Sequence, residues 1–340
     1  MKVKDIKEQG LLKILHRFCP TDIVGDDAAI LPTQPQKSLV VTTDMLVDGV
    51  HFSDRTTSAE DVGWRAAAAN LSDLAAMGAF PLGITIALGI NGDTPVAWVE
   101  QLYNGIAECL QPYNTPIVGG DIARSPITTI SITAFGEVEP LNTILRSKCQ
   151  PENVIVATGV HGASRAGLEL LLHPELGETL TEAERYALIL AHQRPQPRLD
   201  ILPILWECLA TDIPNFAENS KSSVLVGGMD SSDGLADAIV QICQASQVGA
   251  RIKRSQIPLP TTLTKFVSSE QALKWALYGG EDFELVLCLP PAIGENLVKK
   301  IGIGAAIVGK TTDNTDILLI DSQGIYPNEK LTLSQGFQHL

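Results

Sequence analysis

The sequence predicts an α/β fold with some α+β character, made of two domains that each contain a mixed sheet. Strand-like segments rich in β-branched residues alternate with amphipathic helical segments in both halves of the chain. The chain has 340 residues, of which 45% are hydrophobic, and this is enough for two cores. A polar, turn-rich segment over residues 140–151 lies near the middle. We therefore predict one domain over residues 1–145 and a second over 146–340, with the boundary near Arg146.

Local patterns predict the elements of the first domain. Residues 1–18 mix Lys and Glu with scattered Leu and Ile, which favours a short amphipathic helix over a signal peptide. A strand is expected where β-branched residues run together, and a helix where apolar residues recur every three or four positions. The predicted strands are 38–43, 82–88, 116–118 and 128–138, and the predicted helices are 59–77 and 95–110.

The second domain is predicted in the same way. Its expected strands are 153–158, 224–226, 283–289, 307–310 and 317–320, and its expected helices are 164–172, 182–193 and 235–245. Residues 304–311 match the phosphate-loop pattern Gly-x4-Gly-Lys-Thr. However, the loop positions are Ala-Ala-Ile-Val, and a turn and another apolar run follow where that loop needs a helix. We interpret this segment as a strand.

Charge and cysteine content limit the possible partners and compartment. The formal net charge is −14, which argues against nucleic acid or an anionic membrane as the main partner. An anionic nucleotide remains possible, because a bound metal ion inverts the local charge. The most apolar stretch, residues 79–90, is too short to span a bilayer. The six cysteines include no Cys-x-x-Cys pair, so we expect reduced thiols and a cytoplasmic protein.

Five acidic motifs, each at the end of an apolar run, carry the chemical prediction. They are Gly25-Asp26-Asp27, Thr42-Thr43-Asp44, Leu71-Ser72-Asp73, Gly119-Gly120-Asp121 and Asp230-Ser231-Ser232-Asp233-Gly234. Strand ends are where an α/β fold converges polar groups on one cleft. Converging carboxylates repel one another, and bound Mg2+ relieves this while sharing its shell with phosphate oxygens. The pattern therefore predicts a Mg2+-dependent enzyme that acts on phosphates.

Each motif taken alone has a structural explanation. An Asp in a turn or at a helix start commonly caps backbone N–H groups, and Ser232 or Asp233 suits that role before a helix. Asp73 is different, because a carboxylate in an Ala-rich, core-like helix is costly unless it is paired or bound to metal. The five together favour one metal–phosphate site. Arg124 and Arg146 either neutralise phosphate there or are solvated surface residues.

The motifs also resemble a known family. The segments are Gly-Asp-Asp-Ala-Ala (25–29), Thr-Thr-Asp-Met-Leu-Val-Asp-Gly-Val-His-Phe (42–52), Asn-Leu-Ser-Asp-Leu-Ala-Ala-Met-Gly-Ala (70–79), Gly-Gly-Asp (119–121), Asp-Ser-Ser-Asp-Gly-Leu (230–235) and Gly-Gly-Glu-Asp-Phe-Glu-Leu (279–285). In this order, across nearly the whole chain, they resemble the thiamine-monophosphate kinases of the aminoimidazole ribonucleotide synthetase-like superfamily. One departure is Ile122-Ala123, where the family usually has a Thr pair.

The resemblance implies a function and an assembly. The implied reaction is ATP-dependent phosphorylation of thiamine monophosphate to thiamine diphosphate, the last step in making that cofactor, by direct in-line transfer without a phosphoenzyme. The implied fold is that of the synthetase-like superfamily, with a homodimer joined through the N-terminal sheets. Because the acceptor phosphate needs little general-base help, we expect Mg2+ alignment to dominate and His51 to bind substrate and not abstract a proton.

The resemblance also implies roles for individual residues. Several Mg2+ ions would be held by Asp27, Thr42, Thr43, Asp44, Asp73, Asp121, Asp230 and Asp233. ATP would contact Tyr103, Gly120, Asp121, Arg146 and Ser232. Thiamine monophosphate would contact His51, Glu281 and an aromatic residue near the C-terminus, for which Phe337 is the nearest candidate. The residues expected to matter most for catalysis are Asp44, Asp73, Asp121 and Arg146.

Two other functions stay open at this point. One is a different enzyme of the superfamily, such as aminoimidazole ribonucleotide synthetase or selenophosphate synthetase. The latter typically uses a reactive Cys in a Gly-rich N-terminal segment, and here Cys19 lies between Phe18 and Pro20 without such a segment. The other is a non-catalytic nucleotide- or metal-binding protein on the same scaffold, because a fold does not fix a function.

Overall fold

The computed structural model of the protein describes residues 1–20, 29, 31–212 and 226–335. The chain divides into two compact units. The first consists of Met1–Leu74, Ala79–Val138 and Gln193–Pro195, and the second of Ala75–Gly78, Glu139–His192 and Gln196–Leu340. The polar segment 140–151, near which we expect the domain boundary, lies within the second unit.

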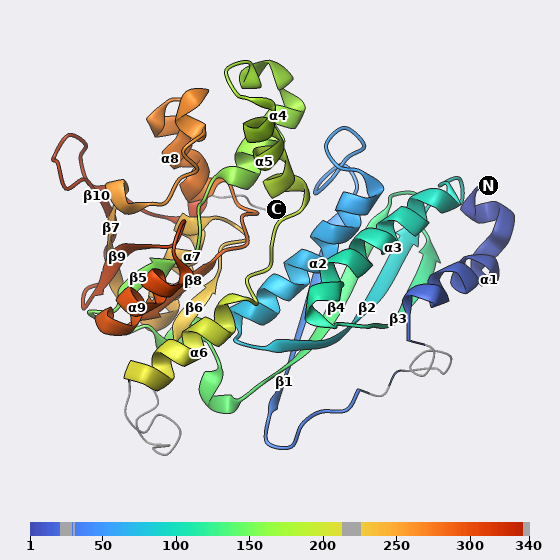
Figure 1. The fold of residues 1–340 in the computed structure, drawn as a ribbon, viewed down its shortest axis with the longest axis horizontal. Coiled ribbons are helices and arrows are strands. Elements are labelled where there is room, and N and C mark those ends of the chain that lie inside the picture. The colour runs from blue at the N-terminus through green and yellow to red at the C-terminus, as the bar shows by residue number, and fades with distance from the viewer. Residues whose placement is uncertain (21–28, 30, 213–225, 336–340) are drawn as a thin grey trace. The chain divides into compact units, whose positions relative to one another are not determined.

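The first unit is an α/β layer built on a mixed four-stranded sheet within the described residues (Figure 1). Its elements are α1 (Val3–Leu15), β1 (Ser38–Val47), α2 (Ala59–Ala76), β2 (Phe80–Ile90), α3 (Val96–Leu110), β3 (Ile117–Arg124) and β4 (Thr129–Val138). The strand order is β1-β4-β2-β3, with β2 and β3 parallel and the other neighbours antiparallel. Each helix and strand predicted for this half is present, and β1, β2 and β3 are longer than expected.

The longer strands correct the expectation that Asp44 and Asp121 follow the ends of strands, whereas Asp73 lies in a helix as predicted. Asp44 lies inside β1, which continues to Val47, and Asp121 lies inside β3. Asp73 lies inside α2. Of the motif residues that the structure describes, only Asp230 ends a strand. The physical reason is strand pairing: β4 holds β1 extended beyond Asp44, and β2 holds Gly119-Gly120 extended beyond the predicted strand 116–118.

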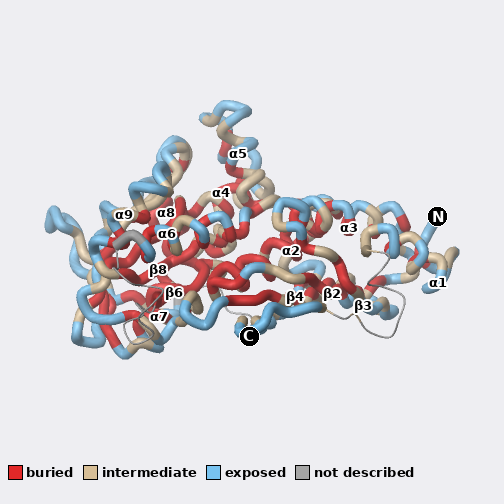
Figure 2. The backbone as a smooth tube through the Cα atoms, turned by 60° about the horizontal axis from the view of Figure 1, so that its bottom comes forward, coloured by how far each residue is buried: buried red, intermediate tan, exposed pale blue. Residues whose placement is uncertain are grey.

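One face of this sheet is covered by helices and the other is open. Ile84, Ile86 and Leu88 of β2 are buried on the covered face, and Figure 2 shows α2 and α3 running along one side of the strands. The two helices approach closely, since a Cβ built on Gly105 would lie 1.7 Å from the carbonyl oxygen of Glu60. Strand alternation places the odd-numbered residues of β1 on the open face.

The second unit is built on a mixed seven-stranded sheet among its described residues, in the order β11-β10-β7-β9-β5-β8-β6 (Figure 1). Its strands are β5 (Val154–Ala157), β6 (Gly227–Asp230), β7 (Gly249–Lys253), β8 (Leu285–Leu289), β9 (Ala306–Thr312), β10 (Ile317–Ile320) and β11 (Glu329–Lys330). Its helices are α4 (Ala163–Leu172), α5 (Glu182–Gln193), α6 (Ile201–Asp212), α7 (Leu235–Ser246), α8 (Ser269–Tyr278) and α9 (Pro291–Ile301).

Both faces of this second sheet are covered. Ile155 and Ala157 of β5 belong to the core cluster that α7 completes. Val156 points the other way, toward α9, since its Cγ2 lies 3.4 Å from a Cβ built on Gly294. The segment that matches a phosphate loop forms β9 and leads through a turn to β10, which confirms its interpretation as a strand. Helices α6, α8 and α9 and strands β7 and β11 were not expected from the sequence. Most of the expected strand 224–226 lies outside the described residues, and β6 begins at Gly227.

Two global expectations are tested directly. All six cysteines are free thiols, five of them buried and Cys19 partly so, as the sequence predicts. Across the described ranges, no helix is both long enough and apolar enough to cross a membrane.

Candidate active site

In the first unit, two of the predicted metal ligands meet across the covered face of the sheet. The hydroxyl of Thr42 on β1 donates a hydrogen bond to the carboxylate of Asp73 on α2. This hydrogen bond offsets part of the free-energy cost of placing the Asp73 carboxylate in an Ala-rich helix. Asp44 lies two residues along β1 from Thr42 and so on the same side of the strand.

Two other predicted ligands lie on the opposite face. The hydroxyl of Thr43 donates to the carbonyl oxygen of Ile132 at 2.9 Å and accepts from the hydroxyl of Thr133 at 3.3 Å. Asp121 is exposed and is in register with Ala87, on the face away from the buried Ile86. The structure therefore brings Thr42 to Asp73 and separates both from Thr43 and Asp121 by the thickness of the sheet.

His51 is hydrogen-bonded to the backbone at the end of β1, whereas the ring of Tyr103 is buried on α3. The backbone N–H of Val47 donates to Nδ1 of His51 at 3.1 Å, so a neutral His51 carries its proton on Nε2. The Tyr103 ring on α3 is buried and lies 5.5 Å from the Phe18 ring, centroid to centroid. Burial raises the pKa of Tyr103 well above its usual range, so the phenol stays protonated.

In the second unit, the Asp230 motif joins β6 to α7. Asp230 ends β6 and is 3% exposed, and the hydroxyl of Ser232 donates to its Oδ1 at 3.2 Å. The backbone N–H and the hydroxyl of Ser231 both donate to the carbonyl oxygen of Glu284, at 2.8 and 3.1 Å. Asp233 then leads to Gly234, which turns with φ +110° into α7. The motif is therefore tied to the segment that precedes β8.

Arg146 lies beside α7. Its Nη1 donates to Oε1 of Gln241 at 2.6 Å, and its carbonyl oxygen accepts from the hydroxyl of Ser246 at 2.7 Å. The guanidinium is thus oriented by a neutral side chain, so its full positive charge is still available to an anion.

Glu281 has an unusual backbone and a buried neighbour. Its φ is +59°, a left-handed value that non-glycine residues rarely adopt. Its N–H donates to the carbonyl oxygen of Ser232 at 2.6 Å. Its carboxylate Oε2 lies 3.6 Å from Nδ1 of His192, which is 3% exposed and also lies 3.2 Å from the Ser164 hydroxyl. One residue predicted to contact ATP, Ser232, and one predicted to contact thiamine monophosphate, Glu281, are therefore joined by a backbone hydrogen bond.

Sequence reasoning missed the buried groups around this turn. The Glu284 carboxylate accepts from the Thr158 hydroxyl at 2.6 Å and from Nη1 of Arg198. Burial raises the pKa of Glu284 and raises that of Asp282 to about 7. Three acids within four residues after Gly279-Gly280, Glu281, Asp282 and Glu284, were the available signal, but the sequence did not show which acid faces the interior.

Two predicted residues, Asp27 and Phe337, lie outside the described residues. Within the described part, no group of three or more His, Cys, Asp and Glu side chains is arranged to hold a metal ion. The predicted ligands themselves fit Mg2+, because they offer only carboxylate and hydroxyl oxygens and include the buried Asp230, whose charge a cation would compensate. The metal-ligand set remains a prediction.

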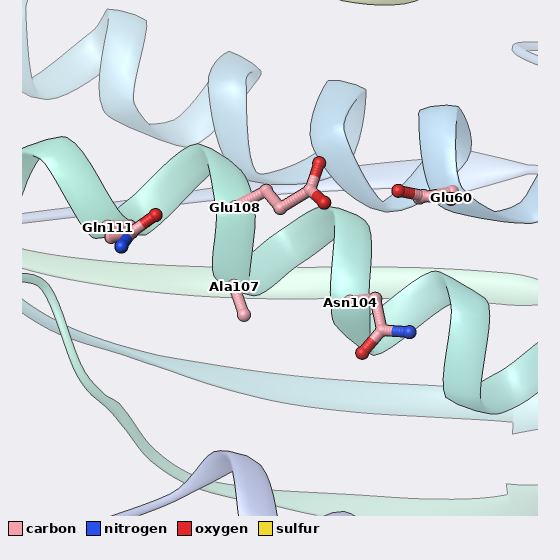
Figure 3. Close-up of a pocket in the computed structure, with 5 residues that line it drawn as sticks. All are labelled: Glu60, Asn104, Ala107, Glu108 and Gln111. Atoms are coloured by element: carbon pink, nitrogen blue, oxygen red, sulfur yellow. The ribbon is translucent and has the colours of Figure 1, made fainter.

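A shallow cavity in the first unit involves none of the predicted residues. It is lined by Glu60, Asn104, Ala107, Glu108 and Gln111, and Figure 3 shows these side chains on α2 and α3. Its carboxylates are already compensated, because Arg194 pairs with Glu60 at 3.2 Å and with Glu108 at 2.8 Å. We assign this cavity no part in the chemistry.

Comparison with known proteins identifies the family. The family model described as AIR synthase related protein, N-terminal domain, matches residues 25–138. Thiamine-monophosphate kinase of Synechococcus elongatus is 48% identical over 340 residues, which cover 99% of this chain and 97% of that protein. The chain belongs to the thiamine-monophosphate kinase family. The family recognised from the motifs in the sequence is thereby confirmed.

Solved structures of thiamine-monophosphate kinases share the fold of this family member. The kinase from Stenotrophomonas maltophilia aligns with a TM-score of 0.74 at 28% identity, covering 91% of this chain and 94% of that one. The structure described as AaThiL complexed with AMPPCP and TMP aligns with a TM-score of 0.69 at 28% identity, covering 97% and 98%. The fold predicted for this chain, two α/β domains that each contain a mixed sheet, is thus the fold of its family.

Proposed function

We propose that this protein is a thiamine-monophosphate kinase that transfers the γ-phosphoryl group of ATP to thiamine monophosphate. The observation that carries the proposal is the hydrogen bond from the N–H of Glu281 to the carbonyl oxygen of Ser232. It joins the residue proposed for the phosphate substrate to the residue proposed for ATP. The relationship to named kinases over nearly the full chain supports the same activity.

The reaction forms one phosphorus–oxygen bond and breaks another. A phosphate oxygen of thiamine monophosphate attacks the γ-phosphorus of ATP, the bond to the β-phosphate oxygen breaks, and ADP leaves with that electron pair. A phosphate monoester has a second pKa of about 6, so the acceptor is largely dianionic at neutral pH and needs no strong base. The protein's task is then to position two anions and offset their charge.

Individual residues would divide this task. The guanidinium of Arg146, oriented by Gln241, would neutralise phosphate charge. His51 would donate from Nε2 to the substrate phosphate, because its Nδ1 accepts from Val47. We propose Asp27, Thr42, Thr43, Asp44, Asp73, Asp121, Asp230 and Asp233 as the ligands of several Mg2+ ions, because Thr42 and Asp73 lie on the opposite face of the sheet from Thr43 and Asp121 and cannot share one ion with them. Bound Mg2+ would supply charge neutralisation at the phosphates.

We also propose that the protein works as a homodimer through the open face of the first unit's sheet. Leu39, Val41 and Met45 of β1 lie on this face and are 55%, 54% and 54% exposed. Three large apolar side chains on one face of a strand, interrupted only by Thr43, form an exposed apolar patch of the kind that marks an interface. A second copy of the same face would cover them, since a twofold interface needs only one self-complementary surface.

An experiment on the dimer uses single substitutions. Val41→Asp places a charge in the proposed interface, and Ile303→Asp is the control on an exposed apolar residue elsewhere. Sedimentation velocity should show a dimer for the wild type and the control and a monomer for Val41→Asp. A wild type that sediments as a monomer would contradict the proposal.

We also propose that the protein is cytoplasmic, because all six of its cysteines are free thiols.

The activity is tested by product analysis with ATP, Mg2+ and thiamine monophosphate, with free thiamine in parallel. Thiamine diphosphate should form from the monophosphate alone. Asp44→Asn and Asp230→Asn should lower kcat by at least about 100-fold, because each removes a proposed ligand charge. Asp321→Asn, a loop-capping residue, is the control. ATP binding without product would favour another enzyme of the superfamily or a non-catalytic binder.

A further inference from the structure

The turn that carries Glu281 is strained. Gly280, Glu281 and Phe283 have φ values of +68°, +59° and +52°, so three residues within four are left-handed and two of them are not glycine. Left-handed backbone is unfavourable for residues with a Cβ, and it persists only where the surroundings impose it. The surroundings of this turn must therefore contain groups that hold it.

Asp282, at the centre of the turn, makes two such contacts with its side chain. Its Oδ2 accepts from the backbone N–H of Gly162 at 2.7 Å, and its Oδ1 accepts from the backbone N–H of Ser164 at 2.9 Å. These N–H groups begin α4, where the first turn of a helix leaves its donors unsatisfied and its dipole favours negative charge. Both oxygens of one side chain thus fasten the turn to a helix 118 residues away in sequence.

The neighbours of Asp282 are fixed by the same arrangement. Phe283, the next residue, is 6% exposed and so is anchored in the core. On the other side, the N–H of Glu281 donates to the carbonyl oxygen of Ser232, and a Cβ on Gly280 would lie 2.8 Å from that same oxygen. The Glu281 carboxylate itself lies 3.6 Å from Nδ1 of His192 on α5, and Asp282 adds two backbone hydrogen bonds from the start of α4.

We propose that Asp282 is a positioning residue, whose carboxylate fastens the turn Gly280–Phe283 to the start of α4 and thereby holds Glu281 beside Ser232 to receive thiamine monophosphate. The inference rests on the proposed function, because it takes Glu281 as the substrate-binding residue. Without the two hydrogen bonds to α4, the backbone at Glu281 and Phe283 can relax to ordinary negative φ values, which turns the Glu281 side chain away.

The kinetic test uses Asp282→Asn and Asp282→Ala, with Glu281→Gln as the direct substrate-site variant and Asp321→Asn as the control. Asp321 matches Asp282 chemically, because it also accepts backbone N–H bonds in a loop, from Ile325 at 2.8 Å and Tyr326 at 3.1 Å. Asp282→Ala should raise the KM for thiamine monophosphate at least about tenfold, a loss typical of a misplaced binding group. Asp282→Asn keeps one acceptor and should fall between Asp282→Ala and the wild type.

The split between KM and kcat separates positioning from general damage. A purely structural role would lower the fraction of folded enzyme, which reduces the apparent kcat and leaves the KM unchanged. Both Asp282 variants retaining a wild-type KM, while Glu281→Gln raises it, would overturn the inference and leave the proposed function standing.

A second measurement does not depend on activity. Crystal structures of the wild type and Asp282→Asn should show Glu281 left-handed in the wild type and displaced in the variant. An unchanged turn in the variant would overturn the inference even if the wild type failed to phosphorylate thiamine monophosphate. Such a failure of the wild type would overturn the proposed function by itself.

Discussion

Removal of Arg198 should expose how much the second unit depends on one buried ion pair. The side chains of Arg198 and Glu284 are only 15% and 14% exposed, and Nη1 of Arg198 donates to the Glu284 carboxylate. The same Nη1 lies 3.3 Å from the carbonyl oxygen of Thr158, and Nε pairs with Asp200 at 3.0 Å. Arg198→Ala would leave the Glu284 carboxylate buried without its cation.

The expected cost follows from that burial. Breaking a buried pair by removing one partner typically costs about 3–5 kcal/mol, because an uncompensated charge remains. The Thr158 hydroxyl, which donates to Glu284 at 2.6 Å, is retained in the variant, so we expect the lower end of this range, about 3 kcal/mol. Burial already raises the pKa of Glu284, and loss of the cation raises it further. The variant should therefore regain stability as the pH falls and Glu284 takes up a proton.

Urea denaturation at about pH 8 and about pH 5.5 measures both effects. Lys310→Ala is the control, because Lys310 and Glu152 form an exposed pair with side chains 48% and 74% exposed. That change should cost less than about 1 kcal/mol. Glu284→Gln added to Arg198→Ala should recover part of the loss, since a neutral amide needs no cation. Equal losses for Arg198→Ala and Lys310→Ala would refute the reasoning.

Three further predictions concern single positions. Gly105→Ala should cost about 2–3 kcal/mol in thermal unfolding, because its Cβ would lie 1.7 Å from the Glu60 carbonyl oxygen and α2 and α3 must separate; an unchanged melting temperature would contradict this. Gln247→Gly should add about 0.5–1 kcal/mol in urea unfolding, because Gln247 caps α7 with φ +58°, and a loss would contradict it. The pKa of Asp282, raised to about 7, means that its contribution to stability is present at low pH and lost as the pH rises through 7. The free energy of unfolding of the wild type minus that of Asp282→Asn should fall from about pH 5 to about pH 8, and a rise would contradict a raised pKa for Asp282.

The type of most elements could be predicted from the sequence because it is a local property. Helix α5 and strand β10 have the predicted bounds, since the period of apolar residues reflects the geometry of one element. Helix α9 was missed although Pro291 at its start and Gly302 after its end are typical helix signals. Strand β3 was shortened at Gly119-Gly120, because the pairing with β2 that keeps these glycines extended is not visible locally.

The family, too, was determined by the sequence, since its motifs stand in one order along the chain and need no coordinates to be compared. Which motif residues meet was decided only by the tertiary structure. Thr42 and Thr43 are adjacent in sequence, yet one faces Asp73 and the other faces the opposite side of the sheet. The sequence does not distinguish Asp282 from Glu281 and Glu284, whereas in the fold its carboxylate accepts two hydrogen bonds from the start of α4. Contacts between residues more than 100 positions apart depend on how whole elements pack, and a local pattern does not encode that packing.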